Sequence, residues 1–370
     1  MLKNLEENVY NYKWKLSDGF PVSGIDYHGI TVFTCFAGGG GSSMGYKLAG
    51  YNVIGFNEID KKMAGCYEKN LGNQGFHYIE DIRKFRKRKN LPDELFNLDI
   101  LDGSPPCTSF SMAGNREKDW GKEKKFREGQ KVQTLDDLLF EYIKLGKRLM
   151  PKVILLENVK GLILGNAIKY LAQICIFLNK MGYYTIWRVL NSKNMGVPQA
   201  RERIFLLALR KDLVSQNNIP LIGMLNPEPK INLQFNNQII PFSKIDEGID
   251  ALKKPSSRKL ALDIGTKTRT LWDKTKPGNS FAKVTQGSFF NSIKIHPNLP
   301  LPTITGSCHL LHYNIPRKLS DNELKLGGTF PIDYDFMKYR NDYIIGMSVP
   351  PVMITQIAHR IYEQWLSKIK

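Results

Sequence analysis

One cysteine of the chain directly follows a pair of prolines, in the stretch Ser104-Pro105-Pro106-Cys107. The apolar run before it, Leu98-Asp99-Ile100-Leu101, is typical of a buried strand. Because two prolines cannot extend that strand, the thiol is expected in the loop at its end, where α/β sheets present reactive groups. A thiolate there can attack an electrophilic carbon and form a covalent intermediate. Cys107 is therefore a candidate nucleophile, and the alternative is a small buried residue without a reactive role.

Charged groups that suit this chemistry follow later in the chain. Val153-Ile154-Leu155-Leu156 is typical of a buried parallel strand, and Glu157 at its tip is a candidate acid or base. Arg201 and Arg203 lie between two further predicted strands, over residues 183–190 and 204–209. A thiol, a carboxyl group and two arginines together indicate covalent catalysis on an electrophilic carbon.

The elements before the cysteine are typical of a nucleotide-binding βαβ unit. A predicted strand over residues 30–36 runs into a glycine-rich turn over 37–45, where glycines let the backbone approach a ligand closely. Glu58 ends a second predicted strand about twenty residues later, where an acid suits two ribose hydroxyls, although a solvated acid at a helix start would look the same. Asp81 and Ile82 are expected to end a third strand, with Asp81 reaching an adenine amino group. The glycine spacing does not match GxGxxG, so these glycines alone do not predict a dinucleotide site.

Composition narrows the class of protein. The 370 residues are 42% hydrophobic and 24% charged, which is typical of a globular protein with an α/β core and a second, smaller unit. The net charge of +18 favours a polyanionic partner, most simply nucleic acid, over a bias towards lysine that serves solubility. Five cysteines without a CxxC pair predict a reducing compartment and no structural zinc site. Without an apolar leader or a run of 18 apolar residues, we expect no signal peptide and no membrane span.

The pattern changes after residue 210. Between about residues 211 and 298 the periodicity weakens, and Pro, Asn, Ser and Lys increase. Basic residues there alternate with four aromatic ones, which suits a nucleic-acid surface, although a poorly packed insertion would look similar. These four are Trp272, Phe281, Phe289 and Phe290. Helical patterning resumes over 317–330, and Pro350 and Pro351 begin a predicted final helix that reaches residue 370.

The order of these motifs resembles the DNA cytosine-5 methyltransferase family of bacterial restriction-modification systems. The resemblance covers nearly the whole chain from residue 31, and although each motif is weak alone, the ordered set is highly specific. The set comprises Phe36-Ala37-Gly38-Gly39-Gly40-Gly41, Glu58, Asp81, Pro106-Cys107 with Phe110-Ser111, Glu157-Asn158-Val159, Gln199-Ala200-Arg201-Glu202-Arg203 and Gly346 with Val349-Pro350.

The resemblance implies a role for each site residue. Cys107 would add to carbon 6 of a cytosine, and Glu157 would donate a proton to N3. Arg203, together with Arg201, would orient that carboxylate and the cytosine carbonyl. The implied cofactor is S-adenosyl-L-methionine, which leaves as S-adenosyl-L-homocysteine, and no metal is implied. Its pocket would be lined by Phe36, Gly38, Gly40, Glu58, Ile59, Asp81, Ile82, Pro106, Ser348 and Val349.

The resemblance also implies a fold, a substrate and a setting. The fold would be α/β, a Rossmann-like methyltransferase sheet with a second, smaller and irregular target-recognition domain. The expected parts are an N-terminal extension (1–29), a catalytic domain (30–210), a target-recognition domain (211–334) and a C-terminal segment that returns to the catalytic domain (335–370). Residues 109–131 resemble the loop that closes over a flipped-out cytosine. The partner would be double-stranded DNA, bound by a monomer in the bacterial cytoplasm, with a cognate restriction endonuclease as a functional partner.

Three departures from the family pattern leave alternatives open. Thr108 stands where the family usually has glutamine, Met347 stands where it usually has asparagine, and the residues before Tyr27 have no counterpart. A tRNA-directed relative would share the same chemistry, although the long segment before Pro302 favours a domain that reads a duplex. Met347 is the one hint of a non-catalytic DNA-binding relative. A nicotinamide dehydrogenase is disfavoured by the glycine spacing and by the Pro-Pro-Cys stretch.

Overall fold

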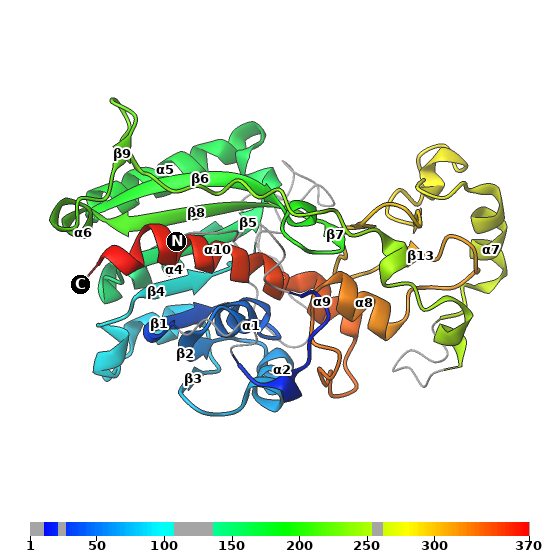
Figure 1. Ribbon diagram of the computed structural model, residues 1–370, viewed down its shortest axis with the longest axis horizontal. Helices are drawn as coiled ribbons and strands as arrows, with labels where there is room; N and C mark the ends of the chain where they lie inside the picture. The colour runs from blue at the N-terminus through cyan, green and yellow to red at the C-terminus, as the bar shows by residue number, and fades with distance from the viewer. Residues whose placement is uncertain (1–10, 21–26, 107–135, 254–261, 370) are drawn as a thin grey trace, which may run out of the picture.

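A seven-stranded mixed sheet organises the larger part of the molecule (Figure 1). The computed structural model describes residues 11–20, 27–106, 136–253 and 262–369. Across the sheet the strand order is β3-β2-β1-β4-β5-β8-β6. The strands are β1 (Tyr27–Cys35), β2 (Tyr51–Asn57), β3 (Phe76–Tyr78), β4 (Ile100–Gly103), β5 (Val153–Val159), β6 (Tyr183–Asn191) and β8 (Glu202–Arg210). The first five pair in parallel, and β8 runs antiparallel to both β5 and β6.

The sheet confirms the α/β class, because its order reverses between β1 and β4 as in doubly wound nucleotide-binding folds. Continuous apolar runs form the central strands, since both faces of a parallel sheet are covered. Two predicted strand ends were misplaced. β5 continues past residue 156 to Val159, because its pairing with β8 extends to Arg203, so Glu157 lies inside the strand. β3 ends at Tyr78, and Asp81 instead caps the helix that follows.

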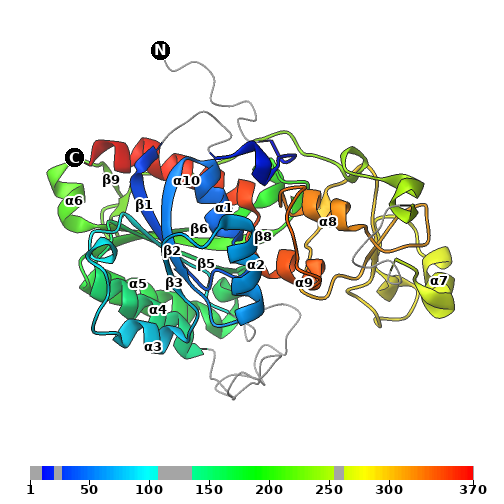
Figure 2. The same ribbon diagram turned by 90° about the horizontal axis from the view of Figure 1, so that it is seen from below.

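Helices cover both faces of the sheet (Figure 2). On one face lie α1 (Gly41–Leu48) and α10 (Pro351–Gln364), and on the other lie α3 (Ile82–Lys87), α4 (Asp136–Leu149) and α5 (Ile168–Lys180). Proline at the first position of α10 agrees with the predicted helix start, but the helix ends at Gln364 and a 3-10 turn follows. Two further helices are α2 (Lys61–Leu71) and α6 (Lys211–Gln216). No helix in the described ranges is both long and apolar enough to cross a membrane.

A second lobe with little regular structure lies beside the sheet (Figure 1). It holds α7 (Gly265–Lys274), α8 (Asp321–Gly327) and strands of two residues each, β11 (Ile293–Lys294), β12 (Leu301–Pro302) and β13 (Leu310–Leu311). Its separate hydrophobic cluster is small: Ile264, Trp272, Phe281 and Leu311. A larger cluster, which includes Ile304 and Phe330 of this part of the chain, also contains Met44 of α1, so the lobe shares much of its core with the sheet domain.

The predicted domain boundaries stay predictions, and packing favours a later start for the second lobe. Ile231, Leu233 and Phe235 belong to the hydrophobic cluster of the sheet domain, so the chain stays on that domain for about 25 residues beyond residue 210. The hairpin of β9 (Leu221–Ile222) and β10 (Glu228–Pro229) is part of this stretch.

A buried polar network stabilises the second lobe. Glu323 accepts two hydrogen bonds from the Arg317 guanidinium, at 2.7 and 2.8 Å, and His312 Nε2 lies 2.9 Å from Asp246 Oδ1. His312 Nδ1 accepts the backbone N–H groups of residues 314 and 315. Although Asp246, His312 and Glu323 lie close enough to hold a metal ion, protein partners already engage them, and Arg317 supplies the positive charge. These contacts indicate a structural network rather than a metal centre.

Candidate active site

A pocket lies at the carboxyl ends of four neighbouring strands, β3, β2, β1 and β4. In doubly wound folds this edge of the sheet, at the reversal of strand order, is where ligands bind. Seven of the ten residues predicted to bind the cofactor line it: Phe36, Gly38, Glu58, Ile59, Asp81, Ile82 and Pro106. Gly40, Ser348 and Val349 do not. The structure thus brings together predicted residues from four segments that are far apart in the sequence, and their contact with a cofactor stays a prediction.

The glycine-rich turn has a backbone that only glycine adopts easily. Gly38 and Gly40 have φ angles of 53° and 86°, in the left-handed region. The Gly40 N–H donates to the Ala37 carbonyl, and the Tyr334 hydroxyl donates to the Gly39 carbonyl at 2.7 Å. Ser348 and Val349 lie behind the turn, where a side chain on Gly41 would collide with them. Gly40, Ser348 and Val349 therefore shape the turn rather than the pocket wall.

Glu58 is the best-positioned polar group in this pocket. Its carboxylate accepts three backbone N–H groups, from Gly38, Ile59 and Asp60, each at 2.8 Å. A carboxylate has about four acceptor positions, so Oε2 can still accept a hydrogen bond from a ligand hydroxyl. Burial raises the pKa of Glu58 above its ordinary value, and the three N–H groups oppose that rise. A fixed acceptor of this kind fits a ribose.

The next part of the pocket suits a flat aromatic ring. Ile59, Ile82, Pro106 and Leu138 provide apolar walls. Asp81, which caps α3 by accepting the Arg83 N–H at 2.7 Å, adds a carboxylate to the same wall. The Asp81 carboxylate, the apolar walls and the glycine-rich turn together fit an adenosine group, which is part of the expected cofactor.

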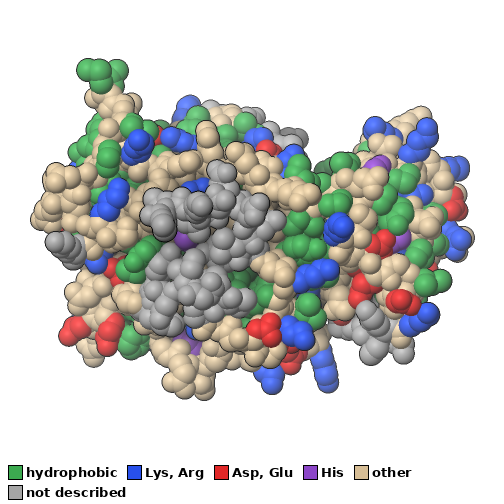
Figure 3. All heavy atoms as spheres, in the orientation of Figure 1, with side chains coloured by type: hydrophobic (Ala, Val, Ile, Leu, Met, Phe, Trp, Pro, Cys, Tyr) green, Lys and Arg blue, Asp and Glu red, His purple; other side chains and the backbone are tan. Residues whose placement is uncertain are grey.

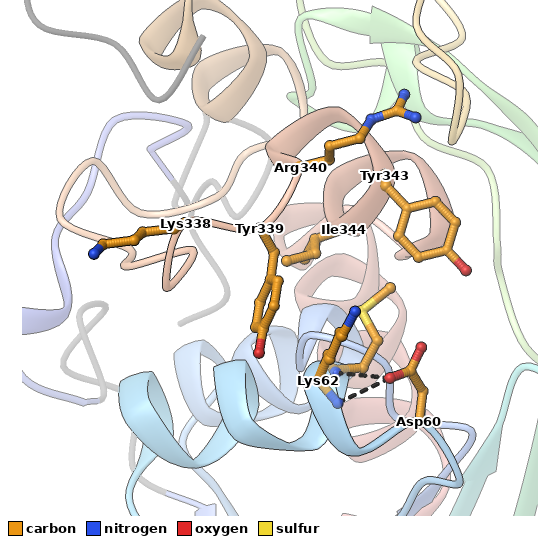
Figure 4. A pocket seen from close by; sticks show the side chains of 8 residues that line it. Asp60, Lys62, Lys338, Tyr339, Arg340, Tyr343 and Ile344 are labelled. Carbon is orange, nitrogen blue, oxygen red and sulfur yellow. Dashed lines mark hydrogen bonds between the residues drawn. The ribbon is translucent and has the colours of Figure 1, made fainter. Parts of the chain in front are cut away.

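Two pocket residues come from the far end of the chain, and sequence patterns did not identify them as ligand-binding. Tyr343 and Met347 lie one turn apart on α9 (Asn341–Met347), and both line the pocket. Tyr343 also lines an adjoining pocket, which Figure 4 shows between α2 and the segment 338–344. Met347 is the residue that replaces the family's asparagine. A thioether is a weaker hydrogen-bond acceptor than an amide and no donor, so Met347 gives this wall an apolar side chain in place of an amide.

A buried ion pair lies at the neighbouring strand ends. Arg203 Nε is 3.0 Å from Glu157 Oε1, and the side chains are only 14% and 9% exposed. The two residues stand on adjacent antiparallel strands, with Glu157 opposite Phe205 in the register. Burial lowers the pKa of Arg203, and the Glu157 carboxylate opposes this shift. The predicted pairing of these two groups is therefore present in the structure.

Arg201 points elsewhere. Its guanidinium donates to the carbonyls of Ile304 and Gly346, each at 3.1 Å, and burial lowers its pKa. Gln199 makes parallel links, accepting from the Ile304 N–H at 3.0 Å and donating to the Gly327 carbonyl at 3.0 Å. The strand β7 (Gln199–Ala200) also pairs with β12. These bonds indicate that Arg201 positions the second lobe and the C-terminal segment, and its predicted contact with the base stays a prediction.

The backbone before the predicted nucleophile is held beside Glu157. Gly103 at the end of β4 pairs with Leu156, and the Asn158 side chain donates to the Pro105 carbonyl at 3.3 Å. Cys107, Thr108 and the predicted loop over 109–131 lie outside the described residues. Within the described residues, Asn158 therefore ties Pro105 to the strand that carries Glu157, and sequence patterns gave Asn158 no role.

A second buried carboxyl group, that of Asp102, lies beneath the site. Its burial leads us to expect that the thermal stability of the protein depends on pH. Asp102 accepts a hydrogen bond from the Tyr46 hydroxyl, and burial raises its pKa from 3.8 to about 8. When the pKa of an acid is higher in the folded than in the unfolded protein, the group stabilises the fold fully at pH values below its pKa in the unfolded state. This stabilisation is lost as the pH rises towards its pKa in the folded state. Wild type should therefore lose thermal stability relative to Asp102→Asn between about pH 4 and pH 8. Thermal unfolding at several pH values tests this, and a constant difference between the two proteins would refute it.

Comparisons with known proteins identify the family. The family model described as C-5 cytosine-specific DNA methylase matches residues 30–363. The Type II methyltransferase M.Sau96I of Staphylococcus aureus is 35% identical over 248 residues, which are 65% of this chain and 53% of that protein. M.Bsp6I of Bacillus sp. (strain RFL6) is 28% identical over 364 residues, covering 91% of this chain and 100% of that protein.

Solved structures agree on the fold. The DNMT2 structure from Spodoptera frugiperda has a TM-score of 0.61 at 15% identity, covering 90% of this chain and 99% of that chain. The methyltransferase EhMeth of Entamoeba histolytica has a TM-score of 0.56 at 14% identity, covering 90% of this chain and 98% of that chain. Because the family model spans most of the sequence, the comparison identifies the protein at the level of its family: the chain belongs to the C-5 cytosine-specific DNA methylases.

Proposed function

We propose that this enzyme transfers a methyl group from S-adenosyl-L-methionine to carbon 5 of a cytosine that has been flipped out of duplex DNA, through a covalent bond to Cys107. The observation that supports this most is the buried Glu157–Arg203 pair, beside the strand end that leads to Pro106. The adenosine-type pocket opens at the neighbouring strand ends. Family membership supports the same chemistry.

The proposed steps assign one task to each residue. The Cys107 thiolate adds to carbon 6 of the cytosine, and the electron pair displaced towards N3 takes a proton from Glu157. Carbon 5, now enamine-like, forms the bond to the methyl carbon as the carbon–sulfur bond breaks. A base then removes the proton on carbon 5, Glu157 recovers its proton from N3, and the thiolate is expelled. Arg203 holds the Glu157 carboxyl group in place throughout, by the 3.0 Å contact.

The bound cofactor would supply an electrophilic methyl group on a positively charged sulfur. This chain's contribution is to orient it. Glu58 would accept a hydrogen bond from the ribose, Asp81 would face the adenine amino group, and the glycine turn would let the backbone approach the cofactor closely. No metal has a task in these steps.

Double-stranded DNA is the proposed substrate, with the second lobe as the target-recognition element. The net charge of +18 suits phosphate contacts. These contacts offset the cost of extruding a base, about a few kcal/mol. Relatives such as M.Sau96I and M.Bsp6I are named Type II methyltransferases, which supports a restriction-modification role with a partner endonuclease. We further propose that a monomer acts on DNA in the bacterial cytoplasm, and that residues 109–131 close over the flipped base.

The direct test is methyl transfer from labelled S-adenosyl-L-methionine to three substrates: duplex DNA, single-stranded DNA and tRNA. We expect label in duplex DNA, with 5-methylcytosine as the product in the hydrolysed nucleosides. Label in tRNA alone would replace the proposal by the tRNA-directed alternative. No transfer to any substrate, with DNA binding retained, would favour a non-catalytic relative.

Replacing Glu58 by glutamine is expected to weaken cofactor binding by about tenfold to a hundredfold, because a hydrogen bond to a charged acceptor is lost. Because the pKa of Glu58 is raised, this side chain takes up a proton at a higher pH than an ordinary glutamate does. The affinity of wild type for the cofactor should therefore begin to fall at that higher pH, and Glu58→Gln should lack this pH dependence. Calorimetry with S-adenosyl-L-homocysteine measures both effects. Glu80→Gln is the matched control, because Glu80 lines the same pocket but pairs with Arg88. Equal effects of the two changes would contradict the ribose role.

A further inference from the structure

Four aromatic residues alternate with basic ones in the second lobe, and the structure separates them into two pairs. Trp272 and Phe281 are buried in the small core of the lobe. Phe289 and Phe290 are 61% and 55% exposed. Adjacent exposed phenylalanines are unusual on a protein surface, and apolar surface of this kind often marks an interaction site. We call residues 284–290 the aromatic tip.

The aromatic tip is held in one conformation by hydrogen bonds at its base. The Ser280 hydroxyl donates to the Phe290 carbonyl at 2.7 Å, and the Ser292 N–H donates to the Phe289 carbonyl at 2.9 Å. The Phe281 N–H, from the core of the lobe, donates to the Ser292 carbonyl at 2.8 Å. The rings are therefore presented on a fixed base rather than on a free loop.

Backbone strain accompanies this exposure. Gln286 has a φ angle of 49° and Phe289 one of 56°, in the left-handed region that bulky residues avoid. Such residues strain the backbone, and strain of this kind gathers at binding sites. Burial of the Phe289 ring does not offset the strain in the free protein, because that ring is exposed. A bound partner that covers the ring would offset it.

The surroundings of the aromatic tip are basic. Of the eight lysines and arginines in residues 262–320, Lys294 and Arg317 are buried and five are exposed, against two exposed aspartates and no glutamate. Lys283 immediately precedes the tip and is exposed. A surface that combines cations with exposed aromatic rings suits nucleic acid, because phosphates bind the cations and bases contact the rings.

The position of the lobe agrees with this match. The lobe is attached to the sheet domain by the pairing of β12 with β7. β7 ends two residues before Glu202, where the strand that carries Arg203 begins. Figure 1 places the segment around residue 285 (yellow) at the upper end of the lobe, away from α8 and α9, where the lobe meets the sheet domain. The aromatic tip thus projects from a lobe that is anchored at the active-site edge.

A second exposed apolar tip provides a contrast. Met224 and Leu225, in the hairpin of β9 and β10, are 100% and 95% exposed. Residues 219–229 contain one glutamate and no lysine or arginine. In Figures 1 and 3 this hairpin projects at the opposite end of the molecule from α7. Apolar exposure alone therefore does not distinguish the aromatic tip; its basic surroundings do.

We propose that Phe289 and Phe290 contact the bases of the DNA duplex that the second lobe binds, by stacking or by apolar contact in a groove. This inference rests on the proposed function and adds a base-contacting element to it. The rings have no group that binds phosphate, so their contribution to affinity should not depend on salt. Lys283, in contrast, is expected to contact a phosphate.

The test measures the affinity of a duplex that wild type methylates, between 50 and 200 mM salt, in the presence of S-adenosyl-L-homocysteine. Phe289→Ala/Phe290→Ala should weaken binding by about tenfold or more, because each ring that contacts a base contributes measurably. The slope of log Kd against log salt should stay that of wild type. Lys283→Gln should reduce the magnitude of that slope by about 0.9, the value for one phosphate. Met224→Ala is the matched control and should bind like wild type.

Each other outcome has a definite meaning. If the double variant binds DNA with wild-type affinity, the proposed base contact is wrong. It is also wrong if the double variant has a smaller slope of log Kd against log salt than wild type. Unchanged midpoints of thermal unfolding show that the variants are folded. If the double variant is unstable, Phe290→Ala alone replaces it in the test, because Phe290 does not have a left-handed φ. A dimer of the free protein that the double variant dissociates would identify the tip as a protein interface and overturn the inference. If wild type methylates no DNA, the proposed function fails instead.

Discussion

Replacing Cys107 by alanine is expected to lower methyl transfer to DNA by about 10⁴-fold or more, as loss of a catalytic nucleophile does. Without a thiolate to add at carbon 6, carbon 5 of cytosine is too weak a nucleophile to accept the methyl group. Binding of DNA and of S-adenosyl-L-homocysteine should persist, because the described pocket is formed by other residues. Transfer of labelled methyl groups and gel-shift titration of the same preparation measure the two properties.

Cys175→Ala is the matched control for the thiol. Cys175 is a partly buried cysteine whose pKa is raised by burial, so it is a poor nucleophile. It packs beside the hydrophobic cluster around α5, on the opposite face of the sheet from α1. This variant should keep wild-type activity. Retained methylation of cytosine by Cys107→Ala would end the covalent assignment.

Replacing Glu157 by glutamine is expected to lower the rate of methyl transfer by about 10² to 10⁴-fold, the usual contribution of a positioned acid. Glutamine keeps the size of the side chain but has no acidic proton to give to N3. It also replaces the carboxyl group that the Arg203 guanidinium, which is 14% exposed, contacts at 3.0 Å by an amide. Single-turnover rates with saturating DNA and cofactor measure the loss without a contribution from binding.

The neighbouring glutamate provides a control for this experiment. Glu202 is exposed and pairs with Lys160 at 2.9 Å, so Glu202→Gln should leave the single-turnover rate near that of wild type. Thermal unfolding separates chemistry from folding, because removing one partner of a buried ion pair also destabilises a protein. A folded Glu157→Gln protein with a wild-type rate would contradict the role of this carboxyl group.

The fold was predictable where the sequence carries local signals. The apolar run around Ile154 and the β-branched run around Val32 became central strands, because both faces of a parallel sheet are buried. The carboxylate–guanidinium pairing of Glu157 and Arg203 was also expected, and it is present. The place of Glu157 within β5 was not expected, because antiparallel pairing with β8 extends the strand beyond its apolar residues.

Other parts of the site depend on contacts between distant segments, which no local pattern reports. Tyr343 lines the pocket only because the C-terminal segment folds back onto the sheet domain. Arg201 bonds carbonyls at residues 304 and 346, more than 100 positions further along the chain. Trp14, in the extension without a family counterpart, packs in the shared core and donates to the Thr329 carbonyl at 2.9 Å. No sequence pattern distinguishes Asp102 from other aspartates, because its raised pKa depends on burial in the folded protein.

The covalent step at residue 107 can be tested most directly by trapping it on random-sequence duplex DNA that contains 5-fluorocytosine. After methyl transfer, fluorine in place of the carbon 5 proton prevents release of the thiolate, so the adduct persists. We predict a protein–DNA complex that survives denaturation, requires S-adenosyl-L-methionine, and maps by peptide mass to Cys107. A methylated duplex without any adduct, or an adduct on another residue, would contradict the mechanism.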